Sequence, residues 1–379
     1  MSTSIRTNKN DEISLRHALD LAGSGIALSS PNPHVGAVIV TENGTVAGKG
    51  THTFEGKKHA EILAIEQAGE ESSGATLYVN LEPCSHQGRT GPCADAVIAA
   101  GIRRVVCCMQ DPNPLVAGQG FAKLRAAGIA VEVGGFEQEA RKLNEAFAKY
   151  IRHKIPFVTL KSAMTLDGKI ALRSDLGASS RGSTRTDWIT GDAARAHVQQ
   201  LRHQSDAILT GIGTVLADDP LHTDRTGLAR RRPLLRVVLD SHLRLPLNSR
   251  LAQSVREDVL IFTEITDALR KKELQALGVR VEHVPRSGAG LDLSAILKRL
   301  GELEITSLLV EGGSLMNTSA LDSGLVDKIF FYLAPKIFGD GAVAFAAGLE
   351  NAVELRDVQL HRLGKDFAVE GLLRDPYSQ

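Results

Sequence analysis

The chain has 379 residues, a length that predicts two domains because a single hydrophobic core rarely grows that large. Hydrophobic residues make up 43% and charged residues 23%, ordinary values for a globular protein. Lysine plus arginine and aspartate plus glutamate both number 44, so the formal net charge is zero, which argues against a general nucleic-acid-binding protein.

No apolar run is long enough to span a bilayer, and the polar N-terminus lacks the apolar segment of a signal peptide. Four cysteines are too few for a disulfide scaffold in a chain of this length. Cys107 and Cys108 lie in the apolar run RRVVCCM, so we expect them to be buried. We therefore expect a cytoplasmic protein in which Cys84 and Cys93 bind a metal or take part in catalysis.

The first 150 residues alternate helix and strand patterns. Apolar residues at helical spacing predict a helix over residues 12–28. Residues 34–50 predict a hairpin that turns at Asn43-Gly44, and a helix begins near His59. The alternation predicts a layered α/β domain with a largely buried sheet. Its further strands are expected at 75–81, 104–109 and 129–133, and its further helices at 92–100 and 121–127.

A charged helix over residues 137–156 predicts a boundary near residue 150, with domains 1–150 and 151–379. The second domain is also expected to be α/β, and its last segment is a predicted hairpin turning at Gly364-Lys365. The Ser/Gly/Arg-rich residues 173–187 predict a mobile surface loop. Strands are expected at 156–164, 206–211, 234–240, 258–263, 306–313 and 328–335, and helices at 193–203 and 293–303.

His59, Cys84 and Cys93 form a candidate zinc site. Three protein ligands leave one position open for water, as in catalytic zinc sites. Glu61 lies two residues after His59, and in zinc deaminases such a glutamate transfers protons without binding the metal. A proline precedes each cysteine, which suits a helix entry or tight turn, and a helix N-terminus would stabilise the thiolates.

Two alternatives to this open site leave Glu61 without a role. One is a closed structural zinc site with His52 or His86 as fourth ligand, and the other is separate packing of the same residues without metal. Eight residues separate the two cysteines, more than in deaminases of nucleic-acid bases. Because that insert contains His86 and Arg89, we expect a substrate with an additional anionic group such as phosphate.

Ten motifs along the chain are shared with one known family. They are NPHVGAVIV, HAE, EPCSHQGRTGPC and QDPNPLVAGQG in the first half, and LKSAMTLDGKIA, WIT, ILTGIGTVLADDP, VVLDS, LVEGGSLMN and LAPKIFG in the second half. On these motifs, nearly the whole chain resembles the bifunctional deaminase/reductase family of riboflavin biosynthesis. The resemblance implies a cytidine-deaminase-like three-layer domain followed by a dihydrofolate-reductase-like α/β domain. The first would deaminate a diaminohydroxy-phosphoribosylaminopyrimidine, and the second would use NADPH to reduce the ribosyl group of the resulting aminouracil to ribityl.

The resemblance also implies roles for individual residues. His59, Cys84 and Cys93 would bind one Zn²⁺ per chain, and Glu61 would be catalytic. The deaminase substrate would contact Asn32, His52, His86, Arg89, Asp111 and Asn113. NADPH would contact Met164, Trp188, Thr214, Asp218, Ser241, Gly313, Ser314, Leu315, Met316, Asn317, Thr318 and Ser319. The reductase substrate would contact Lys161, Thr186, Arg202, His222, Arg225 and Glu311, and either Lys161 or Glu311 would polarise or protonate the opened ribose.

Taken alone, several of these motifs also fit simpler roles. GIGTVL by itself predicts a turn, and LLVEGGSLMN predicts a strand followed by a helix whose N-terminus either binds a phosphate or is a plain connection. Asn32, Asn113 and Asp218 are typical turn or cap residues. Trp188, the single tryptophan, fits core packing equally well.

The sequence departs from the family pattern in two places. The segment 173–187 before the WIT motif is longer than expected, which affects the role implied for Thr186. His222 occupies a position where an apolar residue is expected. Three alternative functions remain open: a tRNA base deaminase, a non-enzymatic zinc-stabilised interaction protein, and a deaminase with an inactive reductase-like domain. We expect a phosphorylated pyrimidine as partner, no nucleic acid or membrane, and possible homo-oligomers.

Overall fold

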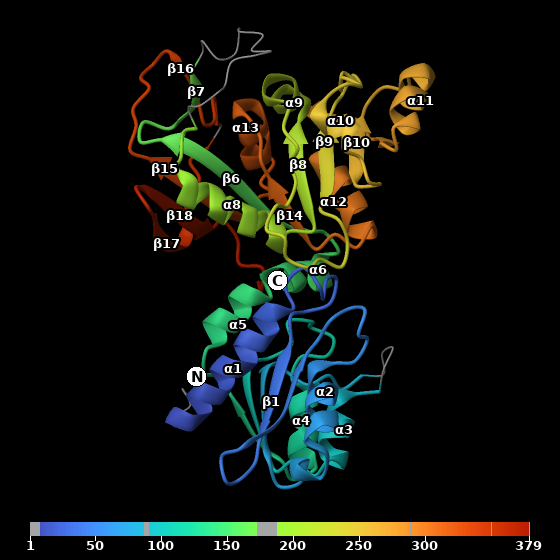
Figure 1. Ribbon diagram of the computed structural model, residues 1–379, viewed down its shortest axis with the longest axis vertical. Helices are drawn as coiled ribbons and strands as arrows, with labels where there is room; N and C mark the ends of the chain where they lie inside the picture. Colours follow the sequence, from blue (N-terminus) through green and yellow to red (C-terminus); the bar gives the residue numbers. More distant parts are fainter. Residues whose placement is uncertain (1–7, 87–90, 173–187, 289, 350, 379) are drawn as a thin grey trace. The chain divides into compact units, whose positions relative to one another are not determined.

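The computed structural model describes residues 8–86, 91–172, 188–288, 290–349 and 351–378. The predictions for Arg89, Thr186 and the 173–187 loop lie outside these residues. The chain divides into two compact units, Met1–Lys154 and Ile155–Gln379 (Figure 1). Among the described residues, no helix combines the length and the apolar character needed to cross a membrane.

The first unit contains a five-stranded sheet in the order β2-β1-β3-β4-β5. Strand β1 is antiparallel to both of its neighbours, whereas β3, β4 and β5 run parallel. All five strands form where the sequence predicts them. Their bounds are β1 (Gly36–Val40), β2 (Val46–Thr51), β3 (Thr76–Leu81), β4 (Arg104–Met109) and β5 (Ala130–Val133).

The helices of this unit differ from the predictions in two places. The predicted helix 12–28 is α1 (Lys9–Ser24), which is capped by Asn8 and ends four residues early. The predicted helix 137–156 is two helices, α5 (Glu137–Leu143) and α6 (Glu145–His153), divided at Asn144. The other helices are α2 (Ala60–Ala68), the short 3₁₀ helix η1 (Gly69–Ser72), α3 (Cys93–Ala99) and α4 (Gln119–Ala126).

Glycines in β1 and β2 let helices approach both faces of the sheet. A Cβ on Gly36 would lie 2.2 Å from the carbonyl oxygen of Ala18 in α1, and one on Gly50 would lie 2.1 Å from that of Ala60 in α2. Gly50 pairs with Ala37, so it faces the opposite side of the sheet from Gly36. Helices α1 and α2 therefore cover opposite faces, which gives the predicted three-layer arrangement (Figure 1).

The second unit contains a nine-stranded sheet in the order β11-β10-β9-β8-β14-β6-β15-β18-β17. The strands from β11 to β15 are parallel, and the C-terminal hairpin of β17 and β18 adds antiparallel strands at one edge. The bounds are β6 (Phe157–Thr165), β8 (Ala207–Gly211), β9 (Leu235–Leu239), β10 (Val259–Thr263), β11 (Arg280–His283), β14 (Ser307–Val310), β15 (Lys328–Ala334), β17 (Arg356–Leu363) and β18 (Asp366–Leu372).

The sequence missed several short elements of this unit. GIGTVL begins helix α9 (Ile212–Asp218), so the predicted turn is wrong, because the glycines lie at the helix entry. Strand β11 was not predicted. Two pairs of short strands lie outside the main sheet, β7 (Lys169–Leu172) with β16 (Ala342–Ala344) and β12 (Arg286–Ser287) with β13 (Gly290–Leu291). The other helices are α8 (Asp192–Gln204), α10 (Arg250–Gln253), α11 (Ala268–Ala276), α12 (Leu293–Glu302) and α13 (Ser314–Asp322).

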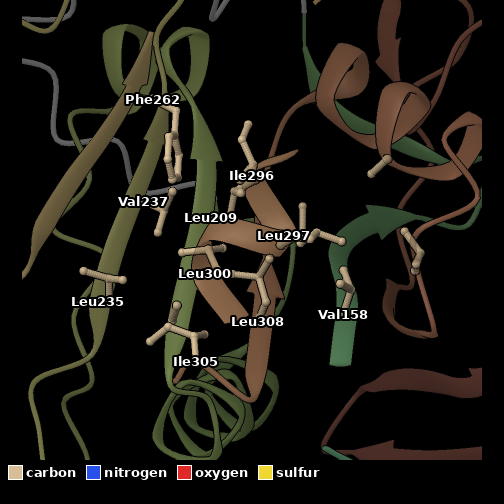
Figure 2. Close-up of a cluster of buried hydrophobic side chains, with 14 of the residues drawn as sticks. Val158, Leu209, Leu235, Val237, Phe262, Ile296, Leu297, Leu300, Ile305 and Leu308 are labelled. Carbon is tan, nitrogen blue, oxygen red and sulfur yellow. The ribbon is translucent and has the colours of Figure 1, made fainter. Parts of the chain in front are cut away.

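The core of the second unit lies between its parallel strands and helix α12. Figure 2 shows Leu209 and Val237, from β8 and β9, on the same side of the sheet as Ile296 and Leu300 of α12. Because β6, β8, β9 and β14 are parallel, their carboxyl ends meet at one edge of the sheet, where ligands bind in open α/β sheets. We therefore expect a second ligand-binding site at this edge of the sheet.

Candidate active sites

Three potential metal ligands come together in the first unit. His59 is the N-cap residue of α2, Cys93 is the first residue of α3, and Cys84 follows β3. Nδ1 of His59 lies 3.0 Å from Sγ of Cys93 and 3.5 Å from Sγ of Cys84. The three ligand atoms all lie within 4.8 Å of one another, and their chemistry suits zinc.

The thiol of Cys84 is placed to ionise. A hydrogen bond from the Cys93 thiol, followed by one from His59, lowers the pKa of Cys84 to about 4. The backbone N–H of Cys93 also donates to Sγ of Cys84 at 3.3 Å. Burial next to a thiolate raises the pKa of Cys93, so without a cation the pair retains one proton. A divalent cation would displace that proton. Metal-binding thiols generally lose their protons when the metal binds.

Glu61 lies in the first turn of α2, beside these ligands, and only 3% of it is exposed. Burial raises the pKa of Glu61, and the positive charge of His59 opposes this effect only in part. A carboxyl group with a raised pKa binds a proton more readily, which suits a group that takes up a proton and passes it on. Its position and its environment therefore suit proton transfer next to a metal-bound water.

The geometry does not support His52 as a fourth ligand. Its Nδ1 donates to the Lys58 carbonyl at 2.8 Å, so its Nε2 accepts from Nδ2 of Asn32 at 3.0 Å. Burial lowers the pKa of His52, which keeps the ring neutral. Among the described residues, no fourth histidine, cysteine or acidic ligand joins the cluster, and His86 is exposed. The site is therefore open, and Asn32 and His52 lie together beside it.

Glu82, which the sequence analysis did not single out, orders the loop that carries Asp111 and Asn113. Its carboxylate accepts from the backbone N–H groups of Asp111 at 3.0 Å, Gly118 at 2.9 Å and Gly120 at 2.8 Å. Burial raises the pKa of Asp111 to about 6, and His86 and Cys84 are close enough to affect it. The side chain of Asn113 accepts from the N–H of Leu115, which is a turn-forming role.

Two asparagines hold the segment next to Asn32. Asn80 of β3 accepts from the N–H of Gly36 at 2.9 Å and donates to the carbonyl of His34 at 2.9 Å. Asn144, between α5 and α6, accepts from the N–H of His34 at 2.8 Å and donates to its carbonyl at 3.1 Å. The break between α5 and α6 therefore places the Asn144 amide against this segment. No local sequence pattern indicated this long-range contact.

The second unit contains a buried charge cluster where β14 ends. Glu311 is 8% exposed, and its two carboxylate oxygens accept from Nε and Nη2 of Arg202 at 2.8 and 3.0 Å. Nζ of Lys161, from β6, lies 3.5 Å from the Glu311 carboxylate. Burial by itself would raise the pKa of Glu311, but the charges of Lys161 and Arg202 outweigh burial and hold that pKa well below its ordinary value. Glu311 is therefore a fixed anion.

Arg202 also fixes the loop that follows α9. Its Nη1 donates to the carbonyl of Thr223 at 3.2 Å, so each of its three nitrogens has a protein acceptor. The phosphate-binding role implied for Arg202 stays a prediction, and the observed contacts show it binding Glu311 and this loop. Arg225 is exposed, and its backbone N–H donates to the side-chain oxygen of Gln199 at 3.0 Å.

The carboxyl ends of β8, β9 and β14 provide polar groups for a cofactor. Among the described residues, buried Oγ1 of Thr210, Oδ1 of Asp240 and Oδ1 of Asn317 have no hydrogen-bond partner. Helix α13 begins directly after Gly313, and the first N–H groups of a helix lack partners within it. Orphan polar atoms beside a helix N-terminus fit a dinucleotide with ribose hydroxyls and a pyrophosphate.

The side chains predicted to contact the cofactor differ in their surroundings, and two of them also hold a neighbouring segment of the protein. Nδ2 of Asn317 donates to the carbonyl of Phe345 at 2.9 Å, and Oγ1 of Thr318 accepts from the N–H of Ala347 at 3.0 Å, so both fasten a neighbouring segment. Trp188 is 64% exposed, which rules out core packing for it. Met164 is buried in β6, Leu315 and Asp218 are exposed, and Ser241 accepts through its carbonyl from Oγ1 of Thr263.

Two family models match the chain. Residues 8–109 match the cytidine and deoxycytidylate deaminase zinc-binding region, and residues 156–369 match the RibD C-terminal domain. The riboflavin biosynthesis protein RibD of Actinobacillus pleuropneumoniae is 42% identical over 369 residues, covering 96% of this chain and 95% of that protein. RibD of Escherichia coli (strain K12) is 40% identical over 375 residues, covering 95% and 98% of the two chains.

The chain is also similar over nearly its whole length to solved structures. The structure of RibD from Acinetobacter baumannii, form 1, aligns with a TM-score of 0.81 and 36% identity over 96% of this chain and 99% of that chain. A diaminohydroxyphosphoribosylaminopyrimidine deaminase/5-amino-6-(5-phosphoribosylamino)uracil reductase from Thermotoga maritima aligns with a TM-score of 0.79 and 37% identity, covering 96% and 98% of the two chains.

Proposed function

We infer the two reactions of this chain from its family, because it belongs to the RibD proteins of riboflavin biosynthesis. It is a bifunctional enzyme, a zinc-dependent deaminase and an NADPH-dependent reductase. The first activity hydrolytically deaminates a diaminohydroxy-phosphoribosylaminopyrimidine, and the second reduces the ribosyl group of the resulting aminouracil to ribityl. The observation that carries this conclusion is the open His59, Cys84 and Cys93 cluster beside the buried carboxyl group of Glu61.

In the deaminase, His59, Cys84 and Cys93 would hold the zinc. When bound, zinc supplies Lewis acidity that makes a water molecule a stronger nucleophile at neutral pH. Glu61 would accept one proton from that water and give it to the ring nitrogen as the new C–O bond forms. It would then pass a second proton, from the added hydroxyl group, to the amino group, so that the C–N bond breaks and ammonia leaves. Asn32 would orient the pyrimidine through its amide, because His52 holds that amide in place. Asp111, His86 and Arg89 would bind the rest of the substrate.

In the reductase, we propose that Lys161 and not Glu311 polarises the carbonyl of the opened ribose. NADPH supplies the hydride when bound, and the carbonyl oxygen must then receive a proton. Glu311 is ionised and held by Arg202, so it has no proton to give. The ammonium group of Lys161 has three donors and makes its ion pair with Glu311 at 3.5 Å. Glu311 would hold the ammonium group of Lys161 in position.

We propose that the enzyme is cytoplasmic and forms homo-oligomers. Four free cysteines suit the cytoplasm, and the substrate is a small phosphorylated pyrimidine, with no nucleic acid or membrane involved. Val358 and Leu360 of β17 and Phe367 of β18 are exposed apolar residues on the edge hairpin of the nine-stranded sheet. An apolar edge of this kind supports a homo-oligomer.

Mass spectrometry of the products, with and without NADPH, tests both activities. We expect zinc-loaded protein to exchange one amino group for an oxo group without NADPH, and to add the hydrogens of one hydride and one proton only when NADPH is present. If deamination occurs but reduction never follows, the second unit is inactive and the deaminase-only alternative holds. If neither mass change occurs, the inferred function is wrong.

A further inference from the structure

The loop that carries Asn32 in the first unit is closed by its own hydrogen bonds. The backbone N–H of Asn32 donates to the carbonyl of Ser29 at 2.9 Å. The side-chain oxygen of Ser29, which is buried, lies 2.6 Å from Nδ1 of His34. Because both ends of this loop are joined, a contact that fixes His34 also fixes Asn32. We call residues 29–34 the Asn32 loop.

Asn144 holds the end of the Asn32 loop from the start of helix α6. Its side-chain oxygen accepts from the N–H of His34 at 2.8 Å, and its side-chain nitrogen donates to the carbonyl of His34 at 3.1 Å. An asparagine at the N-cap of a helix usually accepts from that helix, but the buried Asn144 side chain makes no capping bond to α6. The amide therefore serves the distant loop and not its own helix.

Arg152, in the last turn of the same helix, holds the loop that carries Asp111. Its Nε donates to the carbonyl of Pro112 at 2.9 Å. Pro112 is buried between Asp111 and Asn113, the two residues of this loop that are expected to contact the substrate. A proline has no N–H, so this carbonyl is the only polar group of its backbone. We call residues 111–113 the Asp111 loop.

Helix α6 therefore contacts both loops of the deaminase site. Arg152 lies eight residues after Asn144, and an α-helix rises about 1.5 Å per residue, so the two contacts are separated by about 12 Å along a stiff element. The two family models match residues 8–109 and 156–369, so α6 lies between the matched regions. We propose that α6 is a spacer that positions the Asn32 loop and the Asp111 loop relative to each other, an inference that rests on the proposed deaminase function.

The substitution R152M tests this proposal, because methionine keeps an apolar stem of similar length and removes the donor. The Asp111 loop would bind the part of the substrate that does not react, so its contacts should act equally in the bound substrate and in the transition state. R152M should then raise KM for the diaminopyrimidine substrate about tenfold, with kcat nearly unchanged and one zinc per chain. A KM within twofold of wild type, or a loss of zinc, would overturn the proposal.

R152K shows whether the hydrogen bond itself is responsible. The ammonium group of lysine can donate to the same carbonyl, so R152K should recover most of the affinity that R152M loses. A purely structural defect would not be repaired in this way. If R152K has the same KM as R152M, the contact with Pro112 does not position the loop.

A double variant separates a spacer from two independent contacts. Serine is a good N-cap residue, so N144S should keep the start of α6, but its side chain is too short to reach His34 as the amide does. N144S alone should lower kcat/KM for deamination about tenfold. If α6 is a spacer, releasing one end already frees the loops, and N144S/R152M should lose little more than either single variant. A loss of about a hundredfold, the product of the two single losses, would contradict the proposal.

R103M is the matched control, because Arg103 is an exposed arginine of the same unit that pairs with Glu42 at 2.7 Å. It should leave deamination unchanged, and all variants should reduce the aminouracil as wild type does. Urea unfolding shows whether each variant is folded, and R152M with R152K tests the proposal without N144S. If wild-type protein does not deaminate the diaminopyrimidine substrate, the proposed function is wrong. If it does so and R152M behaves as R103M, only the role of α6 is wrong.

Discussion

Glu61 and Glu311 are both buried glutamates, one in each unit, and their pKa values shift in opposite directions. Glu61 faces one histidine and two thiols, so burial dominates and raises its pKa. Glu311 is buried to a similar extent but contacts Arg202 and Lys161, which hold its pKa well below its ordinary value. The comparison shows that neighbouring charge, more than burial, decides whether a carboxyl group carries protons or stays a fixed anion.

The opposite pKa shifts of Glu61 and Glu311 predict different roles for the two side chains, proton transfer for Glu61 and positioning for Glu311. A carboxyl group that changes protonation state can transfer protons between the water and the pyrimidine, as we propose for Glu61. A carboxylate bound by a guanidinium fork cannot do so, but it holds Arg202 and Lys161 in one arrangement. Removing the carboxylate charge should therefore stop a chemical step in the first unit and loosen the structure in the second.

The largest effect is expected for E61Q. Glutamine keeps the size of the side chain but cannot accept a proton, so the deamination rate should fall about ten-thousand-fold, the upper end of general acid–base catalysis. Zinc content, measured by metal analysis, should stay at one per chain, and reduction of the aminouracil should continue at the wild-type rate. E66Q, which changes an exposed glutamate of the same helix, is the control. Appreciable deamination by zinc-loaded E61Q would mean that Glu61 does not transfer the protons, and the contrast drawn with Glu311 would then be wrong.

E311Q should have a smaller effect on rate and a larger one on stability. Without the carboxylate charge, Arg202 and Lys161 become uncompensated cations, the loss of a buried partner that typically costs about 3 kcal/mol. Reduction should slow about a hundredfold because Lys161 is no longer held in place. Urea unfolding and NADPH oxidation measure the two effects.

Glu302, an exposed residue of α12 that pairs with Arg299, provides the matched control for E311Q. E302Q should change neither the free energy of unfolding nor kcat by a measurable amount, since exposed ion pairs contribute little. If E311Q is as stable and as active as E302Q, then the Glu311 cluster positions nothing and the comparison with Glu61 fails.

Much of this molecule could be predicted from local sequence patterns. Alternating strand and helix signals indicated every strand of the first sheet, and the residue types His59, Cys84 and Cys93 indicated the metal site without structural knowledge. These predictions succeed because buried strands and metal ligands depend on residue type and short spacing. GIGTVL failed as a turn because its glycines begin a helix whose stability comes from packing.

Contacts over long sequence distances could not be predicted. Asn144 divides two helices and binds the backbone of His34. Glu82 accepts from the backbone N–H groups of Asp111, Gly118 and Gly120. Neither contact produces a periodic pattern or a characteristic residue spacing in the sequence. The pairing of Arg202 with Glu311 spans 109 residues, so a sequence alone cannot tell a phosphate-binding arginine from one that binds a carboxylate. Tertiary folding decides such roles.

The smallest expected effect concerns the pH dependence of stability, and it tests whether a histidine buried beside Glu311 has the lowered pKa that burial and the nearby cations require. Burial, with Arg202, Lys161 and Arg236 adding to it, lowers the pKa of His222 from 6.5 to about 4. The unfolded chain therefore binds a proton at His222 more readily than the folded chain does. This stability contribution is complete above pH 6.5 and is lost progressively as pH falls towards 4.

Between pH 7 and pH 5, this single group should lower the free energy of unfolding by about 2 kcal/mol. H222F has no proton to bind at this position, so its stability should fall less than that of wild type over the same range. H283Q, which changes an exposed histidine of β11, should follow wild type. Urea unfolding at both pH values gives the difference directly, because all other titrating groups are shared. If H222F and wild type lose the same stability, folding does not lower the pKa of His222, and the contrast between the two glutamates must be argued from Glu311 alone.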